Sequence, residues 1–106
     1  MTKLSDAVTD CFSQIEDPHL RDHLIDFGVQ SGPSIATQTL QGILGIDRTG
    51  QLGSNTLASL AIRDQRTINN RLVVERVKMI GRVVVTRPAQ LGLLGGWLEH
   101  ALTFIR

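Results

Sequence analysis

Four acidic residues lie close together near the start of the chain, and carboxylates are the groups that glycoside hydrolysis commonly uses. They are Glu16, Asp17, Asp22 and Asp26. On a helix, Asp22 and Asp26 share one face, because residues four positions apart are neighbours. Asp26 is the most notable of them, since apolar residues flank it. Surface acids at this spacing are common, so a solvated helix face is the alternative, and we assign no catalytic residue.

Two histidines, His19 and His23, are also four positions apart, with Asp22 and Asp26 adjacent. This spacing could hold a metal ion on one face of a helix. A third, remote ligand is missing from the pattern, and a solvated polar face explains the same residues. We therefore expect neither a metal site nor a cofactor.

Two further side chains have chemistry of their own. The ring of Trp97 could stack on a sugar, but its helical spacing with Leu94, Leu98 and Ala101 predicts a core residue. Cys11 belongs to an apolar stripe and is predicted to be a small core residue. As the single cysteine it cannot form an internal disulfide.

The composition predicts one folded domain over residues 1–106. Apolar residues make up 42% and charged residues 20%, which argues against disorder. No apolar run approaches the roughly 18 residues of a membrane span. The first residues lack a basic region followed by an apolar stretch, so we expect a chain made in the cytoplasm without a signal peptide.

The charge is unevenly distributed along the sequence. Residues 1–47 carry seven acids and two bases, a net of −5, whereas residues 48–106 carry nine bases and three acids, a net of +6. Such a division indicates either a basic binding face or two halves that attract each other. The arginines are spread along the sequence, which favours attraction and makes nucleic acid an unexpected partner.

The elements that must position these residues are predicted to be helices. Apolar residues recur at helical spacing, while Asp17-Pro18 and Ser31-Gly32-Pro33 mark helix boundaries. We predict an all-α fold, a compact bundle of about six helices with a short turn or hairpin near 46–53. The helices are expected over about 4–15, 18–29, 33–44, 54–61, 65–85 and 88–105. The apolar stripe of the first consists of Leu4, Val8, Cys11, Phe12 and Ile15.

Residues 26–57 contain an ordered series of short motifs. An Asp-Phe-x-Val run is followed by a Leu-Gln pair, a Leu-Gly pair, and a glycine turn that ends in Thr-Leu. The positions are Asp26, Phe27, Val29, Gly32, Ala36, Leu40, Gln41, Leu44, Gly45, Gly50, Gly53, Thr56 and Leu57. In this order the motifs resemble the muramidases of glycoside hydrolase family 108, which include phage endolysins and bacterial secretion activators. Arg76 and Gly96-Trp97 fit the family's arginine-bearing helix and its late Gly-Trp pair.

The resemblance covers roughly residues 20–106 and leaves an N-terminal helix within 1–17 outside it. It implies a lysozyme-like C-terminal lobe that binds peptidoglycan, through either the glycan or the peptide. The ligand-binding residues it suggests are Asp26, Gln30, Ser31 and Gln41. The structural residues it suggests are Gly32, Gly50, Gly53, Thr56, Arg76 and Trp97.

The sequence departs from the family at several points. Gln30 replaces an asparagine, Thr49 replaces an aspartate, and His100 stands where an arginine is usual. The family's catalytic glutamate lies upstream in a Glu-Gly-Gly-type motif, and the roughly 20 residues before the matching region hold no such motif. The resemblance therefore implies a peptidoglycan-related role without its catalytic residue.

The motif residues also have an interpretation as scaffold. Gly50 and Gly53 would give backbone freedom to a tight turn. Ser54 would cap the following helix, and Gln41 would hydrogen-bond a loop.

Arg76 lies within the apolar face of the predicted 65–85 helix, whereas Arg71 and Arg82 face water. An unpaired buried charge costs several kcal/mol, so Arg76 must have acceptors. We predict that it is at least half buried and that Asp26 is its partner.

Three functions remain open at this point. The chain is a non-catalytic peptidoglycan-binding domain, part of a split or minimal lytic muramidase, or a structural or adaptor protein in a phage particle or an oligomer. The first two place it at the cell wall or periplasm. A homo-oligomer or a partner chain is compatible with all three.

Overall fold

The computed structural model describes residues 3–106, apart from the side chains of residues 3–5 and 90. The described residues form six α-helices and one 3₁₀ helix, with no strand among them, so the all-α prediction is confirmed. The elements are α1 (Lys3–Cys11), α2 (Pro18–Ser31), α3 (Pro33–Leu44), α4 (Ser54–Ala61), α5 (Gln65–Thr86), η1 (Pro88–Leu93) and α6 (Leu94–Leu102). Within the described part, no helix is both long enough and apolar enough to cross a membrane.

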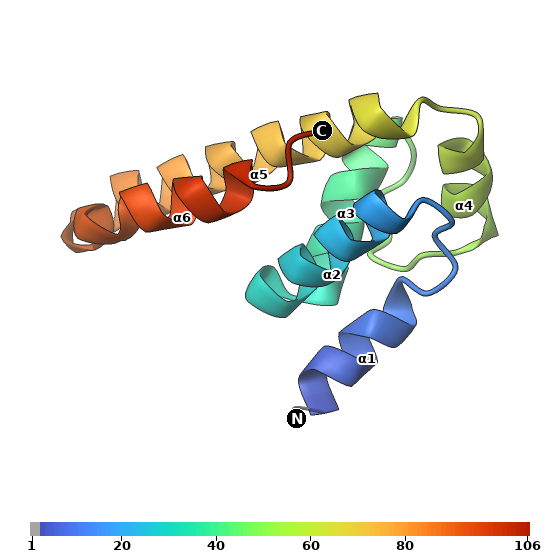
Figure 1. Ribbon diagram of the computed structural model, residues 1–106, viewed down its shortest axis with the longest axis horizontal. Coiled ribbons are helices and arrows are strands. Elements are labelled where there is room, and N and C mark those ends of the chain that lie inside the picture. Colours follow the sequence, from blue (N-terminus) through green and yellow to red (C-terminus); the bar gives the residue numbers. More distant parts are fainter. Residues whose placement is uncertain (1–2) are drawn as a thin grey trace.

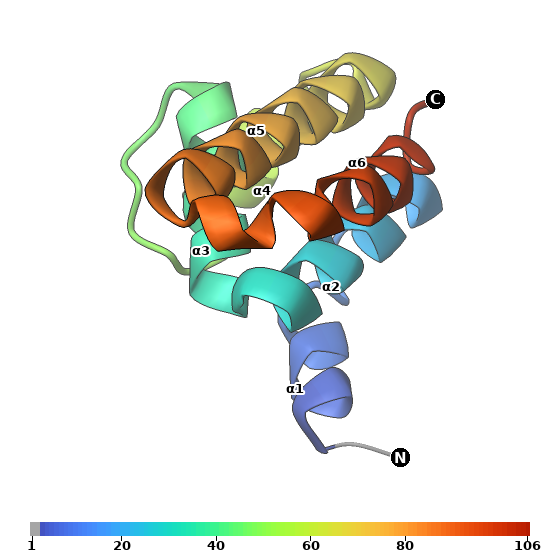
Figure 2. The same ribbon diagram turned by 90° about the vertical axis from the view of Figure 1, so that its left-hand side faces the viewer.

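The helices are arranged around α2 and α3, which follow each other in the chain and pack together. Helix α5 packs across both of them, and α6 runs back along α5 (Figures 1 and 2). Helix α1 packs on α2, and α4 contacts α3. The second half of α5, η1 and α6 extend beyond the other helices; we call residues 77–102 the α5–α6 arm (Figure 1).

The predicted start of α2 is present. The Asp17 carboxylate accepts a hydrogen bond from the His19 N–H at 3.3 Å, and Pro18 follows as the first helical residue. Asp64 caps α5 by accepting hydrogen bonds from the N–H and hydroxyl of Thr67, which lower the pKa of Asp64. Ser54 was predicted to be a cap, but it is the first residue of α4, and Gly53 precedes it without a side-chain cap.

Helix α1 is shorter than predicted and buries a different set of residues. It ends at Cys11, where the Ser13 hydroxyl bonds the Asp10 carbonyl and closes the turn. Phe12 and Ile15 are still buried, but they reach the core from this turn. Cys11 is exposed, so its assignment to the core was wrong, and the Leu4 side chain lies outside the described residues.

Helix α1 packs closely against α2 at Gly28. A Cβ added to Gly28 would lie 2.8 Å from Val8 Cγ1 and 3.1 Å from Phe12 Cε2. The absence of a side chain at Gly28 therefore lets α1 approach the backbone of α2. The core behind this contact draws its buried apolar side chains from α1, α2, α3, α4 and α5.

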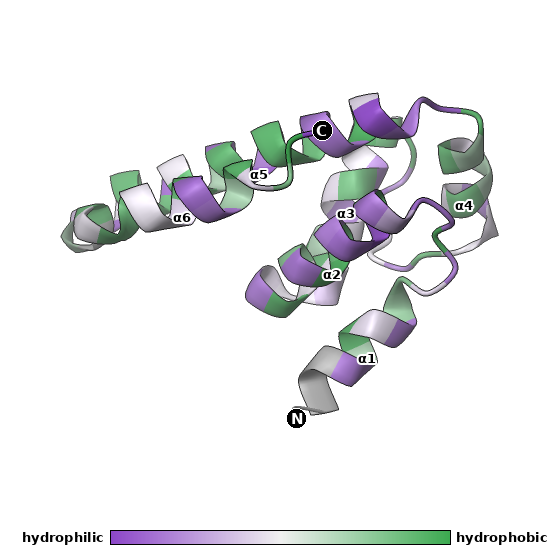
Figure 3. Ribbon diagram, viewed as in Figure 1, coloured by the Kyte–Doolittle hydropathy of each residue, from purple (hydrophilic) through white to green (hydrophobic). Residues whose placement is uncertain are grey.

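The α5–α6 arm is less buried than its sequence predicted. On α5 the fully buried residues end at Arg76, and Ile80 and Val84 are only half-buried. The predicted last helix begins as the 3₁₀ helix η1, and glycines at 92, 95 and 96 weaken its helical preference. Leu91 on η1 and Ile105 just after α6 continue the apolar spacing of Leu94, Leu98 and Ala101, but they are 59% and 53% exposed. Figure 3 shows apolar residues continuing to the far end of the arm.

Replacing Phe12 with alanine tests the docking of α1. Phe12 is fully buried, so the loss of its ring should destabilise the protein by about 3–5 kcal/mol. Chemical denaturation measures this change. The exposed neighbour Cys11 gives the control, since Cys11→Ala should leave the free energy of unfolding within about 0.5 kcal/mol of its original value. Equal stability of the two variants would show that α1 does not pack as described.

Candidate functional site

The buried guanidinium of Arg76 is the centre of the site. Its side chain is 3% exposed, and Nη1 lies 3.0 Å from Oδ2 of Asp26 on α2. The second terminal nitrogen donates a hydrogen bond to the side-chain oxygen of Gln30, one turn further along α2. The predicted burial of Arg76 and its predicted partner Asp26 are both confirmed.

Two aromatic rings enclose the same guanidinium. Its central carbon lies 5.0 Å from the centroid of the Phe27 ring and 5.8 Å from that of Phe104, within the range of cation–π attraction. Burial lowers the pKa of Arg76, and the charge of Asp26 opposes this shift. The ordinary pKa of arginine is so high that the guanidinium stays charged even when it is buried. It therefore needs these neighbours to stabilise its charge.

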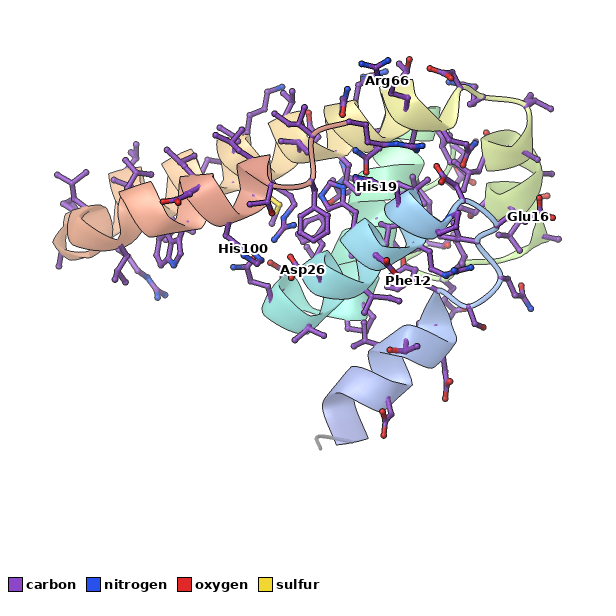
Figure 4. All side chains as sticks on the ribbon, viewed as in Figure 1. Phe12, Glu16, His19, Asp26, Arg66 and His100 are labelled. Carbon is purple, nitrogen blue, oxygen red and sulfur yellow. The ribbon has the colours of Figure 1, made fainter. Side chains whose placement is uncertain are left out.

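Asp26 has a second partner on α6. Nε2 of His100 lies 3.0 Å from both carboxylate oxygens, and Figure 4 shows the two side chains facing each other between α2 and α6. Asp26 thus joins α2 to α5 through Arg76 and to α6 through His100. In the family that the sequence resembles, position 100 is usually an arginine. That difference was the signal in the sequence from which this contact with Asp26 could have been predicted.

A hollow of about 270 Å³ lies beside the ion pair; we call it the Trp97 hollow. Its lining comes from α2, α5 and α6 and consists of Phe27, Gln30, Ser31, Arg76, Met79, Ile80, Val83 and Trp97. Trp97 is half-buried in its wall, so the prediction that it belongs to the core was wrong. The physical reason is that α6 packs mainly on α5 and η1, so few helices surround the Trp97 ring. Met79, Ile80 and Val83 were not predicted, because apolar residues on a helix carry no distinguishing sequence signal.

Gln41 does not join this site. Its amide nitrogen donates to the Thr49 hydroxyl, the Gln51 carbonyl and the Thr56 hydroxyl, at 3.0 to 3.1 Å. Its amide oxygen accepts the N–H of Gly50 at 3.0 Å. Gln41 therefore fastens the 46–53 segment onto α3, as the scaffold interpretation predicted.

The glycines of this segment differ in what they contribute. Gly50 has φ +81°, a left-handed conformation that favours glycine, and a Cβ there would lie 2.5 Å from the Ser34 hydroxyl. Gly53 has φ −98°, which any residue adopts, so the predicted need for a glycine there was wrong. Gly32, between α2 and α3, has φ +96°. Residues 46–53 form a loop rather than a hairpin.

His23 is a core residue rather than part of a solvated face. It is fully buried, its ring stacks on that of Phe104 with centroids 4.6 Å apart, and Nδ1 lies 2.8 Å from the Asn69 side-chain oxygen. Asn69 donates its own amide to the Phe104 carbonyl at 2.7 Å, which leaves its oxygen to accept from His23. Burial lowers the pKa of His23 from 6.5 to about 4, so the ring is neutral at pH 7.

The remaining acids and histidines do not converge on a catalytic or metal site. Glu16 and Asp22 are exposed, while Asp17 caps α2 and pairs with Arg106. His19 bonds the Phe104 carbonyl at 2.8 Å. Among the described residues, no group of three or more potential metal ligands is present. Asp26 and Asp17 each pair with an arginine from the basic half, so attraction between the halves is real.

Comparison with known proteins gives a likeness of structure. No family model matches the chain, and no curated protein matches it. Among solved structures, that of SagA from Brucella abortus superposes with a TM-score of 0.66 at 23% identity, covering 100% of this chain and 67% of SagA. The two proteins share a fold. At 23% identity the similarity concerns the fold alone. A ligand can be inferred only from the residues of this chain.

Arg76→Ala should destabilise the protein by about 3 kcal/mol or more. It removes one member of a buried ion pair and the cation held between two rings. Arg71 and Arg82 are exposed on the same helix, and their changes to alanine should each cost less than about 0.5 kcal/mol. Thermal melting compares the three variants. Equal melting temperatures would refute the central role of Arg76.

Acid should weaken the fold through His23. Between pH 6.5 and about 4 the unfolded chain binds a proton at this residue and the folded chain does not, so stability falls as the pH is lowered through this window. The shift corresponds to about 3 kcal/mol at most. Denaturant unfolding across this pH range should show a steeper decline for the original protein than for His23→Gln. Identical pH dependence in both would contradict the assignment.

Proposed function

We propose that this chain is a non-catalytic module that binds peptidoglycan and that the Trp97 hollow receives its glycan strand. The observation that carries the proposal is the meeting of Trp97, Gln30 and Ser31 in one hollow. An aromatic ring offers a flat apolar surface to the C–H face of a sugar, while amides and hydroxyls bond its polar groups.

Two polar groups at the hollow are available to a ligand, the Gln30 amide nitrogen and the Ser31 hydroxyl. The Gln30 side-chain oxygen is occupied by Arg76, which fixes the side chain. Within the described residues, neither the amide nitrogen of Gln30 nor the Ser31 hydroxyl has a protein partner. The volume of about 270 Å³ is just below the roughly 300–1,000 Å³ of sites for drug-sized ligands, so it suits a single sugar ring.

The class of ligand is supported by two further findings. The motifs from Asp26 to Leu57 resemble the muramidases of glycoside hydrolase family 108, and the fold is shared with SagA. Asp26 forms an ion pair with the buried Arg76 and lies 3.0 Å from Nε2 of His100, so its carboxylate is engaged in holding the helices together. We therefore favour binding over catalysis and place the action of the protein at the cell wall.

An interaction protein that reuses the scaffold is the second candidate. A hollow of about 410 Å³ between α5 and the end of α6 is lined mostly by apolar side chains, including Val74, Leu102 and Ile105. These three are about half exposed, which is unusual for a group of large apolar residues.

Sedimentation with insoluble peptidoglycan tests the proposal. The protein should pellet with the cell walls, and Trp97→Ala should weaken binding about tenfold or more, because a central aromatic side chain dominates such contacts. Leu91→Ala is the matched control, since Leu91 is exposed on the same arm but does not line the hollow. Protein that stays in the supernatant at low salt would refute the proposal, and a stable oligomer by light scattering would then favour the interaction protein.

A further inference from the structure

A second hollow, of about 460 Å³, lies between α3 and α5 and is bordered by three arginines. They are Arg48 from the 46–53 loop and Arg71 and Arg82 from α5, and the rest of the lining includes Gln38, Thr39 and Glu75. We call it the arginine hollow. The arginines that look dispersed in the sequence are therefore brought together by the fold.

The three guanidinium groups have no acidic partner. Within the described residues, no carboxylate is within ion-pair distance of any of them, and Glu75 instead pairs with Lys78 at 3.3 Å. Arg71 and Arg82 are eleven residues apart, about three helical turns, and so share one face of α5. The charged lining has three positive groups and one negative group, which favours a ligand with several negative charges.

Arg48 is held in position by its surroundings. A Cβ on Gly42 would lie 3.2 Å from Arg48 Nη1, so the guanidinium packs against the bare backbone of α3. The loop that carries Arg48 is fastened to α3 by Gln41. Gln41 thus acts as a positioning residue for this arginine, and its side chain need not touch a ligand.

The arginine hollow adjoins the Trp97 hollow. Met79 lines both of them, the Trp97 hollow on the side of α2 and α6 and the arginine hollow on the side of α3. A ligand that fills both must combine a neutral, sugar-like part with an acidic part a short distance away.

We infer that the arginine hollow binds the carboxylates of the peptide stem that peptidoglycan carries on its glycan. This inference rests on the proposed function and adds a second contact to it. The stem is a short peptide rich in carboxylates, whose planar groups match the guanidinium fork. Glu75 offers an acceptor for an N–H or an amine of the same peptide. Extended nucleic acid would need a longer basic track than these three groups provide.

Calorimetry with soluble fragments tests this inference. The probes are the N-acetylglucosamine–N-acetylmuramic acid disaccharide with its stem peptide, the same disaccharide without the peptide, and the peptide alone. The variants are Arg48→Gln, Arg71→Gln, Arg82→Gln and their triple combination. Arg87→Gln is the matched control, because Arg87 is also exposed and lies outside the hollow.

We expect the disaccharide with the peptide to bind more tightly than the bare disaccharide. Each substitution in the hollow should weaken its binding about two- to fivefold, the range of a partly exposed charge pair, and leave the bare disaccharide unaffected. Arg87→Gln should change neither, and added salt should remove most of the peptide's contribution. All three arginines are exposed, so the variants should keep their melting temperatures.

The other outcomes separate this inference from the proposed function. Equal binding of both disaccharides, unchanged by the substitutions, would overturn the inference and keep the glycan site. Arginine-dependent binding of the peptide without binding of the disaccharide would support the inference and overturn the glycan site. No binding of any fragment would overturn both, and arginine-dependent binding of a single-stranded oligonucleotide in place of the peptide would overturn the inference.

Discussion

A positive charge buried among helices is the constraint that organises this molecule. Arg76 lies where α2, α5 and the C-terminal segment meet, and each of them contributes to its neutralisation or enclosure. Asp26 supplies the opposite charge, Gln30 an acceptor, and Phe27 and Phe104 their ring faces. Because a guanidinium has a fixed planar geometry, these groups fit it only when the helices adopt one relative arrangement. The Trp97 hollow is built on this arrangement, since Arg76, Phe27 and Gln30 also form part of its wall.

The sequence predicts the helix starts well, but it predicts only some of the contacts between residues far apart in the chain. The Asp17-Pro18 pair marks the start of α2 and Asp64 marks the start of α5, because capping depends on neighbouring residues alone. The Arg76–Asp26 pair was predictable because a charge on an apolar face has very few acceptable partners. The burial of His23 was not predictable, since its partners Asn69 and Phe104 are distant in sequence and no pattern distinguishes them.

The errors have a common origin in the arm. Helical periodicity shows which residues share a face but not whether another helix covers that face. Trp97, Leu91 and, just beyond the arm, Ile105 have the spacing of core residues, yet η1 and α6 pack mainly on α5 and on each other. In the same way, Arg48, Arg71 and Arg82 are separated in sequence, and only the packing of α3 on α5 brings them to one hollow. The candidate ligand surfaces therefore come from tertiary structure, whereas their scaffold comes from local signals.

The attachment of residues 104–106 determines the order in which this structure can assemble. Phe104 and Arg106 bond side chains of α2, α5 and the residue before α2, and the pair formed by Arg106 and Asp17 spans 89 positions. Closing a loop of that length is entropically costly, whereas α2 and α3 are joined by a single residue. We therefore expect the α2–α3 and α5–α6 pairs to form early from local contacts and the docking of residues 104–106 beside α2 to be a late folding step. Until that step is complete, Arg76 lacks its contact with the Phe104 ring. The α2 side of the Trp97 hollow and its α5–α6 side have then not yet come together.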